Sequence, residues 1–500
     1  MVVRRYGNPE KLRDVYRLSS LSGPIQFGVH NNNLSNLRRG LVERVFYVEG
    51  PTGLVPPPRP LPGVFDTRLQ EFKDRLLGHM KLASPCTLDQ FVQLYAGDRR
   101  QKVYQKAVES LQLEPVCPKD AHLTTFVKAE KVNFSKKPDP APRVIQPRTP
   151  RYNSEVGCYV KQLEKRLYRG IAKVFGETTV LKGYNAADSG RLMREKWEKY
   201  HRPVAVGLDA SRFDQHVSED ALRWEHSVYE ACFYSPDRRK LRNLLRWQID
   251  NRGCARASDG HIKYRVRGCR MSGDMNTALG NCLLMSGMVW AYLREIGIRA
   301  SLANNGDDCV VIMEQKDLAR FTQGLTTWFV EMGFTMKVEP PVTVFEQIEF
   351  CQTHPIWVDG GYLMCRDGLT AMAKDCHSVL PLKEGRVALG WATAIGECGL
   401  SLCGGIPIFQ AFYQRLIQAG EGVHMGAHPA LESGFARLSA GMQRRVRLVS
   451  DATRVSFWEA FGILPSQQVR LEAMLTDTSV SLRTVLQRAT TEDHSFLLAI

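Results

Sequence analysis

Apolar residues recur every three or four positions over much of the chain, which is the spacing of amphipathic helices. This spacing is found in residues 67–82, 88–111, 444–464 and 466–475. Between about residues 201 and 365, strand patterns alternate with helix patterns, and Val204, Val206 and Leu208 lie in an apolar run typical of a buried strand. The pattern therefore predicts an α+β protein whose strands are concentrated in the middle of the chain.

Two segments depart from these patterns. Residues 51–63, PTGLVPPPRPLPG, are rich in proline and should follow an extended path, either as a linker or as an ordered strap on the surface of the body. Residues 126–153 are basic, rich in proline and broken by turns, and we interpret them as a loop-dominated arm with short strands. Helical spacing returns from Ser154.

The charge of the chain indicates what kind of partner it binds. The 500 residues include 67 Lys and Arg against 52 Asp and Glu, a formal net charge of +15, which indicates a polyanionic partner with nucleic acid as the first candidate. The thirteen cysteines contain no CxxC pair, which favours reduced thiols and no disulfide-linked partner. We find neither the apolar core of a secretory signal nor the roughly 20 consecutive apolar residues of a membrane-spanning helix.

The first candidate for chemistry is an aspartate at the end of the central predicted strand. Asp209 directly follows Leu208, and Asp214 comes five residues later, as the chain turns towards a helix near Ser218. Burying an unpaired carboxylate is costly, and a metal cation would remove that cost. An N-cap or a salt bridge would also remove it, so this segment alone leaves both interpretations open.

Two adjacent aspartates, Asp307 and Asp308, lie at a predicted tight turn. Asn305 and Gly306 form a strong hairpin signal, and an apolar return strand follows. Two neighbouring carboxylates raise each other's pKa unless a divalent cation keeps both ionised. Together with Asp209 they form the expected ligand set of a two-metal phosphoryl-transfer site that holds Mg²⁺ and in which Mn²⁺ can substitute.

A polar segment lies between these aspartates. Ser272 and Gly273 predict a flexible turn, and a long helix should begin at about residue 274 or 275. Asn276 and Thr277 would then lie in its first turns, where small polar side chains can bind a ribose or a template backbone. Ordinary N-terminal capping is the alternative.

In this order, DxxxxD at 209–214, SGxxNT at 272–277 and GDD at 306–308 resemble motifs A, B and C of viral RNA-dependent RNA polymerases. Further stretches are similar to the polymerases of plant positive-strand RNA viruses of the tombusvirus, carmovirus and umbravirus group. They are FGVHNNNLSNLRRGLVERVF at 27–46, PRVIQPRTPRYN ending at Asn153, and EFCQTHP at 349–355. The resemblance runs from about residue 23 to at least residue 370.

The resemblance implies a right-hand fold of fingers, palm and thumb, with an antiparallel palm sheet and a largely helical thumb, closed by fingertip and N-terminal connections. The expected regions are an N-terminal extension bridging fingers and thumb (1–63), fingers with the basic arm 126–153 (64–200), palm (201–229), a fingers insertion (230–267), palm again (268–365) and thumb (366–500).

The resemblance also implies roles for single residues. Asp209 and Asp307, supported by Asp308, would hold two Mg²⁺ ions, and Lys337 matches the motif D lysine that protonates the leaving pyrophosphate, with an exposed strand lysine as the alternative. Asp214 and Asn276 would read the ribose 2′-hydroxyl. The full expected nucleotide-binding set is Asp214, Ser272, Gly273, Asn276, Thr277, Lys128, Lys137, Arg143 and Arg148.

These features predict an RNA-directed RNA polymerase that replicates a positive-strand viral genome, and the resemblance implies that it starts without a primer. A non-catalytic viral RNA-binding protein is the alternative, and it explains the charge but not three acidic motifs in order. A helicase is disfavoured because the chain has no GxxxxGK[ST] loop. The expected partners are RNA template and product, NTPs, and a separate or upstream membrane-anchored viral replication protein. That protein or segment would recruit the chain from the host cytoplasm to membrane-bound replication complexes.

Overall fold

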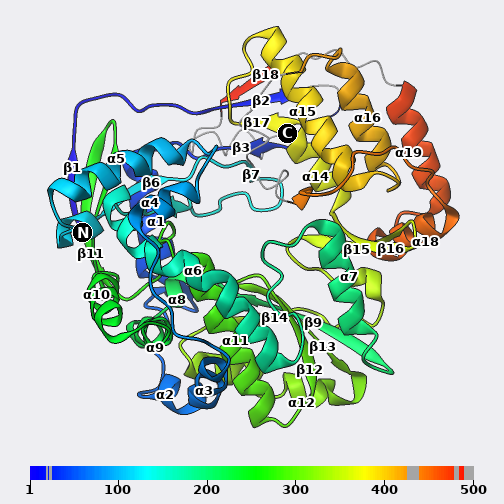
Figure 1. Cartoon of the computed structure of the whole chain (residues 1–500). Coiled ribbons are helices and arrows are strands. Elements are labelled where there is room, and N and C mark those ends of the chain that lie inside the picture. Colours follow the sequence, from blue (N-terminus) through cyan, green and yellow to red (C-terminus); the bar gives the residue numbers. More distant parts are fainter. Residues whose placement is uncertain (19–20, 22–24, 425–437, 478–483, 489–500) are drawn as a thin grey trace.

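The computed structural model describes residues 1–18, 21, 25–424, 438–477 and 484–488 as a mixture of helices and strands (Figure 1). Two large apolar cores hold it together. The first contains Val204, Val206 and Leu208, and the second contains Ala205. One strand therefore contributes to both cores, because its successive side chains point to opposite faces.

That strand belongs to a four-stranded sheet in the order β12–β13–β9–β14, in which every pair is antiparallel. The strands are β9 (Pro203–Ala210), β12 (Ala300–Asn304), β13 (Asp308–Glu314) and β14 (Met336–Val338). Helix α11 (Thr277–Glu295) packs in the first core, and helix α7 (Ala186–Trp197) packs in the second. The sheet is thus buried on both faces, as the apolar run predicted.

The hairpin between β12 and β13 forms where Asn305 and Gly306 predicted it. The Asn305 amide donates to the Asp308 carbonyl at 2.9 Å, and Gly306 has a φ of +103°, a conformation that favours glycine. Asp307 occupies the turn and Asp308 begins β13.

A five-stranded sheet lies in the order β1–β11–β10–β6–β8. Its strands are β1 (Val2–Arg5), β6 (Leu123–Val127), β8 (Val144–Ile145), β10 (Asp250–Ala257) and β11 (Gly260–Arg267). One face of this sheet packs against helix α1 (Leu34–Leu41). The π-helix η1 (Val42–Phe46) directly follows α1 and packs into the same core. The predicted insertion 230–267 therefore supplies two central strands of this sheet, together with helix α10 (Ser235–Arg246).

The N-terminal segment joins this sheet to the C-terminal helices. Strand β1 pairs with β11, whereas β2 (Asp14–Leu18) pairs with β17 (His377–Ser378) and β18 (Thr484–Arg488). The blue chain between β1 and β2 crosses the top of Figure 1. A second connection pairs β3 (Phe27–Gly28) with β7 (Val132–Asn133).

Lys131, next to β7, extends this second connection. Its Nζ donates to the carbonyl oxygens of Lys374 at 2.5 Å and His377 at 2.9 Å. Helix α14 (Gly368–Asp375) ends at this contact. The basic arm is therefore tied to the C-terminal region through backbone carbonyls.

The proline-rich segment 51–63 is an ordered strap and not a free linker. It begins in the hairpin of β4 (Val48–Gly50) and β5 (Gly53–Val55). The Leu61 amide then donates to the Glu331 carbonyl at 2.8 Å, and Pro60 packs closely on Gly333. The strap lies along the start of β14, while the long connection across the molecule is made by residues 1–18.

The predicted helical stretches form helices with different bounds: residues 88–111 are divided between α4 and α5, and residues 444–464 are helical only over α18. Helix α19 begins at Pro465, because a proline at the first helical position sacrifices no hydrogen bond. No helix within the described residues is long and apolar enough to cross a membrane. The other helices are α2 (Val64–Arg68), α3 (Gln70–Gly78), α4 (Leu88–Gln93), α5 (Arg100–Leu113), η2 (Pro118–Ala121), α6 (Pro150–Phe175), α8 (Phe213–His216), α9 (Glu219–Ala231), η3 (Gln315–Asp317), α12 (Leu318–Thr322), α13 (Leu325–Glu331), η4 (Phe345–Gln347), α15 (Gly385–Cys403), α16 (Phe409–Ala419) and α18 (Asp451–Phe461), and the hairpin is β15 (Thr353–Val358) with β16 (Gly361–Arg366).

Candidate active site

Strand register brings three of the predicted catalytic residues together. Asp308 on β13 and Lys337 on β14 are both paired with Asp209 on β9, which lies between them. Directly paired residues of neighbouring strands present their side chains on the same face. Asp307 adjoins this row at the turn, so the GDD and DxxxxD motifs meet at one end of the sheet.

The electrostatics of this row favour a bound cation. Burial, followed by the neighbouring charge of Asp307, raises the pKa of Asp308 from 3.8 to about 6. Burial and the charge of Asp209 also raise the pKa of Asp307, against the opposing effects of Arg143 and Lys182. Carboxylate oxygens are the ligands that Mg²⁺ and Mn²⁺ prefer, so this donor set fits such an ion.

In the described structure these carboxylates do not form a preformed metal-binding cluster. Within the described ranges, no three His, Cys, Asp or Glu side chains are grouped closely enough to hold a metal ion. Asp209 and Asp307 both reach solvent at this end of the sheet, although the protein packed around Asp307 still raises its pKa. The identity and number of the ions therefore stay predictions.

Asp214 is the end of a buried chain of polar contacts. The Asn281 Nδ2 donates to Asp214 Oδ1 at 2.7 Å, and Arg270 Nε donates to Asn281 Oδ1 at 3.0 Å. Arg270 in turn forms a fully buried ion pair with Glu225, with Nη1 to Oε1 at 3.0 Å. Burial raises the pKa of Asp214, although Asn281 and Arg270 oppose the effect.

Asn276 occupies a different place from the one predicted. Its side chain is fully buried and donates to Glu225 Oε1 at 2.9 Å and Gln248 Oε1 at 3.2 Å. It has no contact with Asp214, and the two are linked only through Glu225, Arg270 and Asn281. The pairing of Asp214 with Asn276 at the sugar is therefore corrected: Asn281 is the neighbour of Asp214.

The other residues of this segment are held by the backbone around them. The Gln146 amide donates to the Ser272 carbonyl at 2.7 Å, and Gly273, with a φ of +128°, lies against Pro147. The Thr277 hydroxyl donates to the carbonyls of Met271 and Asp274. The turn at Ser272 and Gly273 thus contacts the basic arm, whereas the Thr277 hydroxyl already has its partners.

The basic arm contains cations of two kinds. Arg143 is exposed, forms a 3.3 Å ion pair with Glu130, and lies close enough to Asp307 and Asp214 to oppose the burial that raises the pKa of both. Lys128 pairs with the same Glu130 at 2.7 Å, and Lys137 is exposed.

Arg148 does not fit direct contact with a nucleotide. Its side chain is completely buried, where Nε donates to Asp274 at 2.6 Å and Nη2 to Asn251 at 2.6 Å. The ion pair ties the arm to the loop after Gly273, so we reassign Arg148 to the support of that loop.

A tight turn at Cys351 and Gln352 lies next to the β12–β13 hairpin that carries Asp307 and Asp308. Cys351 and Gln352 both have positive φ, and Phe350 and Thr353 exchange backbone hydrogen bonds across them. Asn305 Nδ2 donates to Cys351 Sγ at 3.0 Å, so the stretch 349–355, which resembles the plant virus polymerases, touches the GDD hairpin. Burial and the charge of Asp308 raise the pKa of the Cys351 thiol to about 12.

Sequence reasoning missed Asn281, Arg270 and Glu225. A signal for Asn281 was available, since it lies four residues after Thr277 and so on the same helix face one turn later. With the helix expected to begin at residue 274 or 275, the relation of Thr277 to Asn281 was not used. In the structure α11 begins at Thr277. The pairing of Arg270 with Glu225 has no local signal, since 45 residues separate them.

Comparison with known proteins now decides the family. A family model described as viral RNA dependent RNA polymerase matches residues 1–483. This chain belongs to the viral RNA-dependent RNA polymerases. The order and placement of its three motifs agree with that membership, and the family as a whole uses divalent metal ions.

Three curated relatives, each named RNA-directed RNA polymerase, are similar over almost the whole chain. The chain is 48% identical to that of Tobacco necrosis virus (strain A) over 97% of its own length and 67% of the relative. It is 46% identical to that of Turnip crinkle virus over 93% and 60%. It is 44% identical to that of Tomato bushy stunt virus (strain Cherry) over 94% and 57%. The chain thus spans between about half and two thirds of the length of these polymerases.

Proposed function

We propose that this chain catalyses template-directed RNA synthesis from NTPs and replicates the genome of a plant positive-strand RNA virus. The observation that carries the proposal is the register that places Asp308, Asp209 and Lys337 side by side on three strands. In the proposed right hand, the four-stranded sheet is the palm, the five-stranded sheet and basic arm belong to the fingers, and the C-terminal helices form the thumb. Residues 1–18 bridge fingers and thumb.

In this reaction each group has one task. Two Mg²⁺ ions held by Asp209, Asp307 and Asp308 would neutralise charge on the triphosphate and on the attacking 3′-hydroxyl. Arg143 orients the triphosphate at the mouth of the arm, because a guanidinium can donate two parallel hydrogen bonds to a phosphate. Lys337 Nζ gives a proton to the leaving pyrophosphate. Asp214, oriented by Asn281, accepts a hydrogen bond from the ribose 2′-hydroxyl.

The wider setting is part of the same proposal. RNA template, RNA product and NTPs are the ligands, and initiation needs no primer. A separate or upstream viral replication protein brings the polymerase to membrane-bound replication complexes in the host cytoplasm. The turn at Cys351 and Gln352, whose Gln352 is exposed, contacts the 3′ end of the growing strand.

The test is incorporation of labelled NTP on a short viral 3′-end RNA, with and without an annealed primer. We expect incorporation that requires template and Mg²⁺ or Mn²⁺ and that proceeds without a primer. RNA binding with no incorporation under any of these conditions would instead identify a non-catalytic RNA-binding protein. Primed synthesis alone would correct the initiation mode and leave the polymerase assignment standing.

A further inference from the structure

The outer face of the five-stranded sheet presents a row of cations to solvent. On β10 and β11 the side chains alternate, so that Ile262 and Tyr264 are buried whereas Lys263 and Arg265 are exposed. Arg252 and Arg256 are exposed on β10 by the same rule. Register places Arg252 directly opposite Arg265, Lys263 opposite Cys254, and Arg256 opposite His261. Like charges directly opposite each other destabilise a sheet, so this face gains from an anion.

Most of these cations have no partner within the protein. Arg265 binds Asp250 through two contacts of 2.6 and 2.7 Å. Within the described residues, the side chains of Arg252, Arg256 and Lys263 make no hydrogen bond or ion pair. They line a hollow of about 760 Å³, and none of the described residues around it is acidic.

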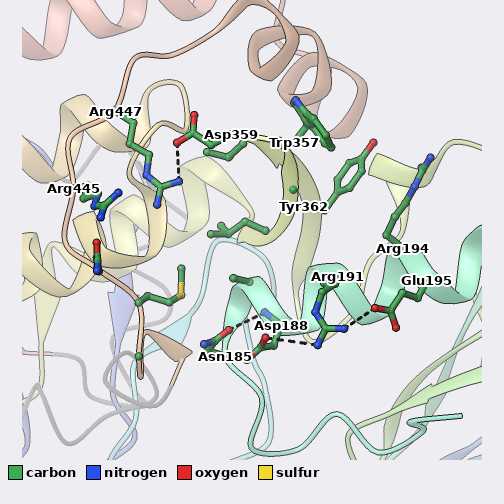
Figure 2. Close-up of a pocket in the computed structure, with 18 of the residues that line it drawn as sticks. Asn185, Asp188, Arg191, Arg194, Glu195, Trp357, Asp359, Tyr362, Arg445 and Arg447 are labelled. Carbon is green, nitrogen blue, oxygen red and sulfur yellow. Dashed lines mark hydrogen bonds and ion pairs between the residues drawn. The ribbon is translucent and has the colours of Figure 1, made fainter.

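A second basic hollow in the same molecule serves for comparison, because acidic side chains lie beside its arginines. A cavity of about 920 Å³ lies between α7 and the β15–β16 hairpin, and arginines are among the side chains that line it (Figure 2). There Arg191 pairs with Glu195 and Arg447 pairs with Asp359. These pairs satisfy Arg191 and Arg447 internally, and the cavity is also lined by Asp188, Glu195 and Asp359, so it has less attraction for a polyanion than the open sheet face has.

Aromatic rings flank the exposed cations. Phe126 on β6 is 39% exposed, and its strand runs beside β10, with Thr124 paired to Cys254 on the same outer face. Tyr6, directly after β1, is 44% exposed and its hydroxyl contacts His261 Nδ1 at 2.5 Å. Cations that follow a backbone, interleaved with rings on which bases can stack, are the chemistry of single-stranded nucleic-acid binding.

We propose that this outer face binds single-stranded RNA, as a site separate from the catalytic centre. Arg252, Arg256 and Lys263 contact phosphates and Phe126 stacks on a base, so the site has no sequence preference. The inference goes beyond the proposed function and rests on it only in taking RNA as the polyanion. Its purpose is to hold template that lies outside the active-site cavity.

The test measures binding of a fluorescein-labelled oligouridylate of about 30 nucleotides by anisotropy over a range of salt concentrations. The variant is Arg252→Gln/Arg256→Gln/Lys263→Gln in the full chain. Each lost phosphate contact on a single strand lowers the slope of log K against log salt by about 0.7, so the slope should become shallower by about 2. Phe126→Ala should weaken binding about tenfold with the slope unchanged.

The matched control is Arg239→Gln/Arg299→Gln/Lys316→Gln, which removes the same residue types and the same net charge from exposed positions elsewhere. We expect its slope to stay near that of the wild type. Equal loss in both triple variants would mean that net charge alone matters and would overturn the proposal. Wild-type binding in the sheet-face variant would overturn it as well.

Two further readouts separate the possible failures. Sedimentation with phosphatidylserine vesicles tests a membrane surface, and loss of vesicle binding with unchanged RNA binding would replace RNA as the occupant. Photo-crosslinking of 4-thiouridine RNA should map to the peptides that contain Phe126 or Lys263, and its absence there would contradict the site. NTP incorporation is measured independently, so a wild-type chain that binds at this face without incorporating NTP refutes the proposed function and not this inference.

Discussion

The two large sheets of this protein display opposite charges in opposite settings. The four-stranded sheet is buried on both faces and places Asp209, Asp307 and Asp308 at one end, where burial and mutual repulsion raise the pKa of the last two. The five-stranded sheet buries one face only and spreads unpaired cations over the other. Concentrated carboxylates need a small, doubly charged ion, whereas dispersed cations suit a long flexible polyanion.

The largest effect should come from the acidic end. Asp307→Ala or Asp209→Ala should lower NTP incorporation by at least about a thousandfold, because loss of a metal ligand removes stabilisation of developing charge. RNA binding should stay near the wild-type level, since it depends on Lys and Arg contacts to phosphates. Primer-extension and anisotropy assays measure the two. Asp220→Ala, an exposed carboxylate on α9, is the control, and near-normal incorporation by Asp307→Ala would refute the assignment.

The buried ion pair behind Asp214 should dominate stability. Arg270→Met leaves Glu225 charged and unpaired in the core, which should cost about 3–5 kcal/mol of unfolding free energy. Adding Glu225→Leu should restore much of it. Arg265→Met breaks an exposed pair on the other sheet and should change chemical denaturation little. Equal losses for Arg270→Met and Arg265→Met would show that the two settings do not differ as described.

Sugar selection should separate Asn281 from Asn276. Asn281→Ala should reduce the ratio of kcat/KM for a matched NTP and dNTP by about tenfold, because Asp214 loses the donor that orients it. Asn276→Ala removes buried hydrogen bonds to Glu225 and Gln248, so it should lower the unfolding free energy by about 1–3 kcal/mol and leave the ratio unchanged. The reverse pattern would return the sugar-reading role to Asn276.

The smallest effect concerns pH. The native pKa of Asp308 is raised from 3.8 to about 6, so between these values the native state binds this proton more strongly than the unfolded chain does. Without divalent ions, the contribution of Asp308 to stability should therefore fall as pH rises from about 4 to about 6. Melting temperatures of the wild type and Asp308→Asn in EDTA measure this contribution as their difference. We expect the wild type to melt near Asp308→Asn at about pH 4 and progressively below it as pH rises to about 6, and added Mg²⁺ should remove this pH-dependent loss. A wild type that gains stability relative to the variant over this range would contradict the sign.

Local patterns predicted the elements that create the acidic end. The apolar run before Asp209 and the Asn305-Gly306 turn each encode their own conformation, and strand β9 and the β12–β13 hairpin formed as expected. The positions and partners of individual side chains were less predictable, because they depend on residues far away in the sequence.

Arg148 and Asn276 show why. Nothing in the basic arm distinguishes Arg143, which stays exposed, from Arg148, which pairs with Asp274 more than a hundred residues later. The loop before α11 has a long-range contact of the same kind, since the Gln146 amide donates to the Ser272 carbonyl and the helix begins only at Thr277. Long-range contacts of this kind leave no periodic signal in the sequence.

The pairing of β2 with both β17 and β18 has a consequence for the order of folding. The three strands lie near opposite ends of the chain in sequence, so their sheet closes a loop of several hundred residues and is among the most non-local contacts in the protein. Such contacts form late, because the entropy of loop closure must be overcome before they stabilise anything. On a ribosome-bound chain, β2 can therefore pair with β17 only after Ser378 has emerged, and this three-stranded sheet is completed by β18 only after nearly the whole described chain has been made.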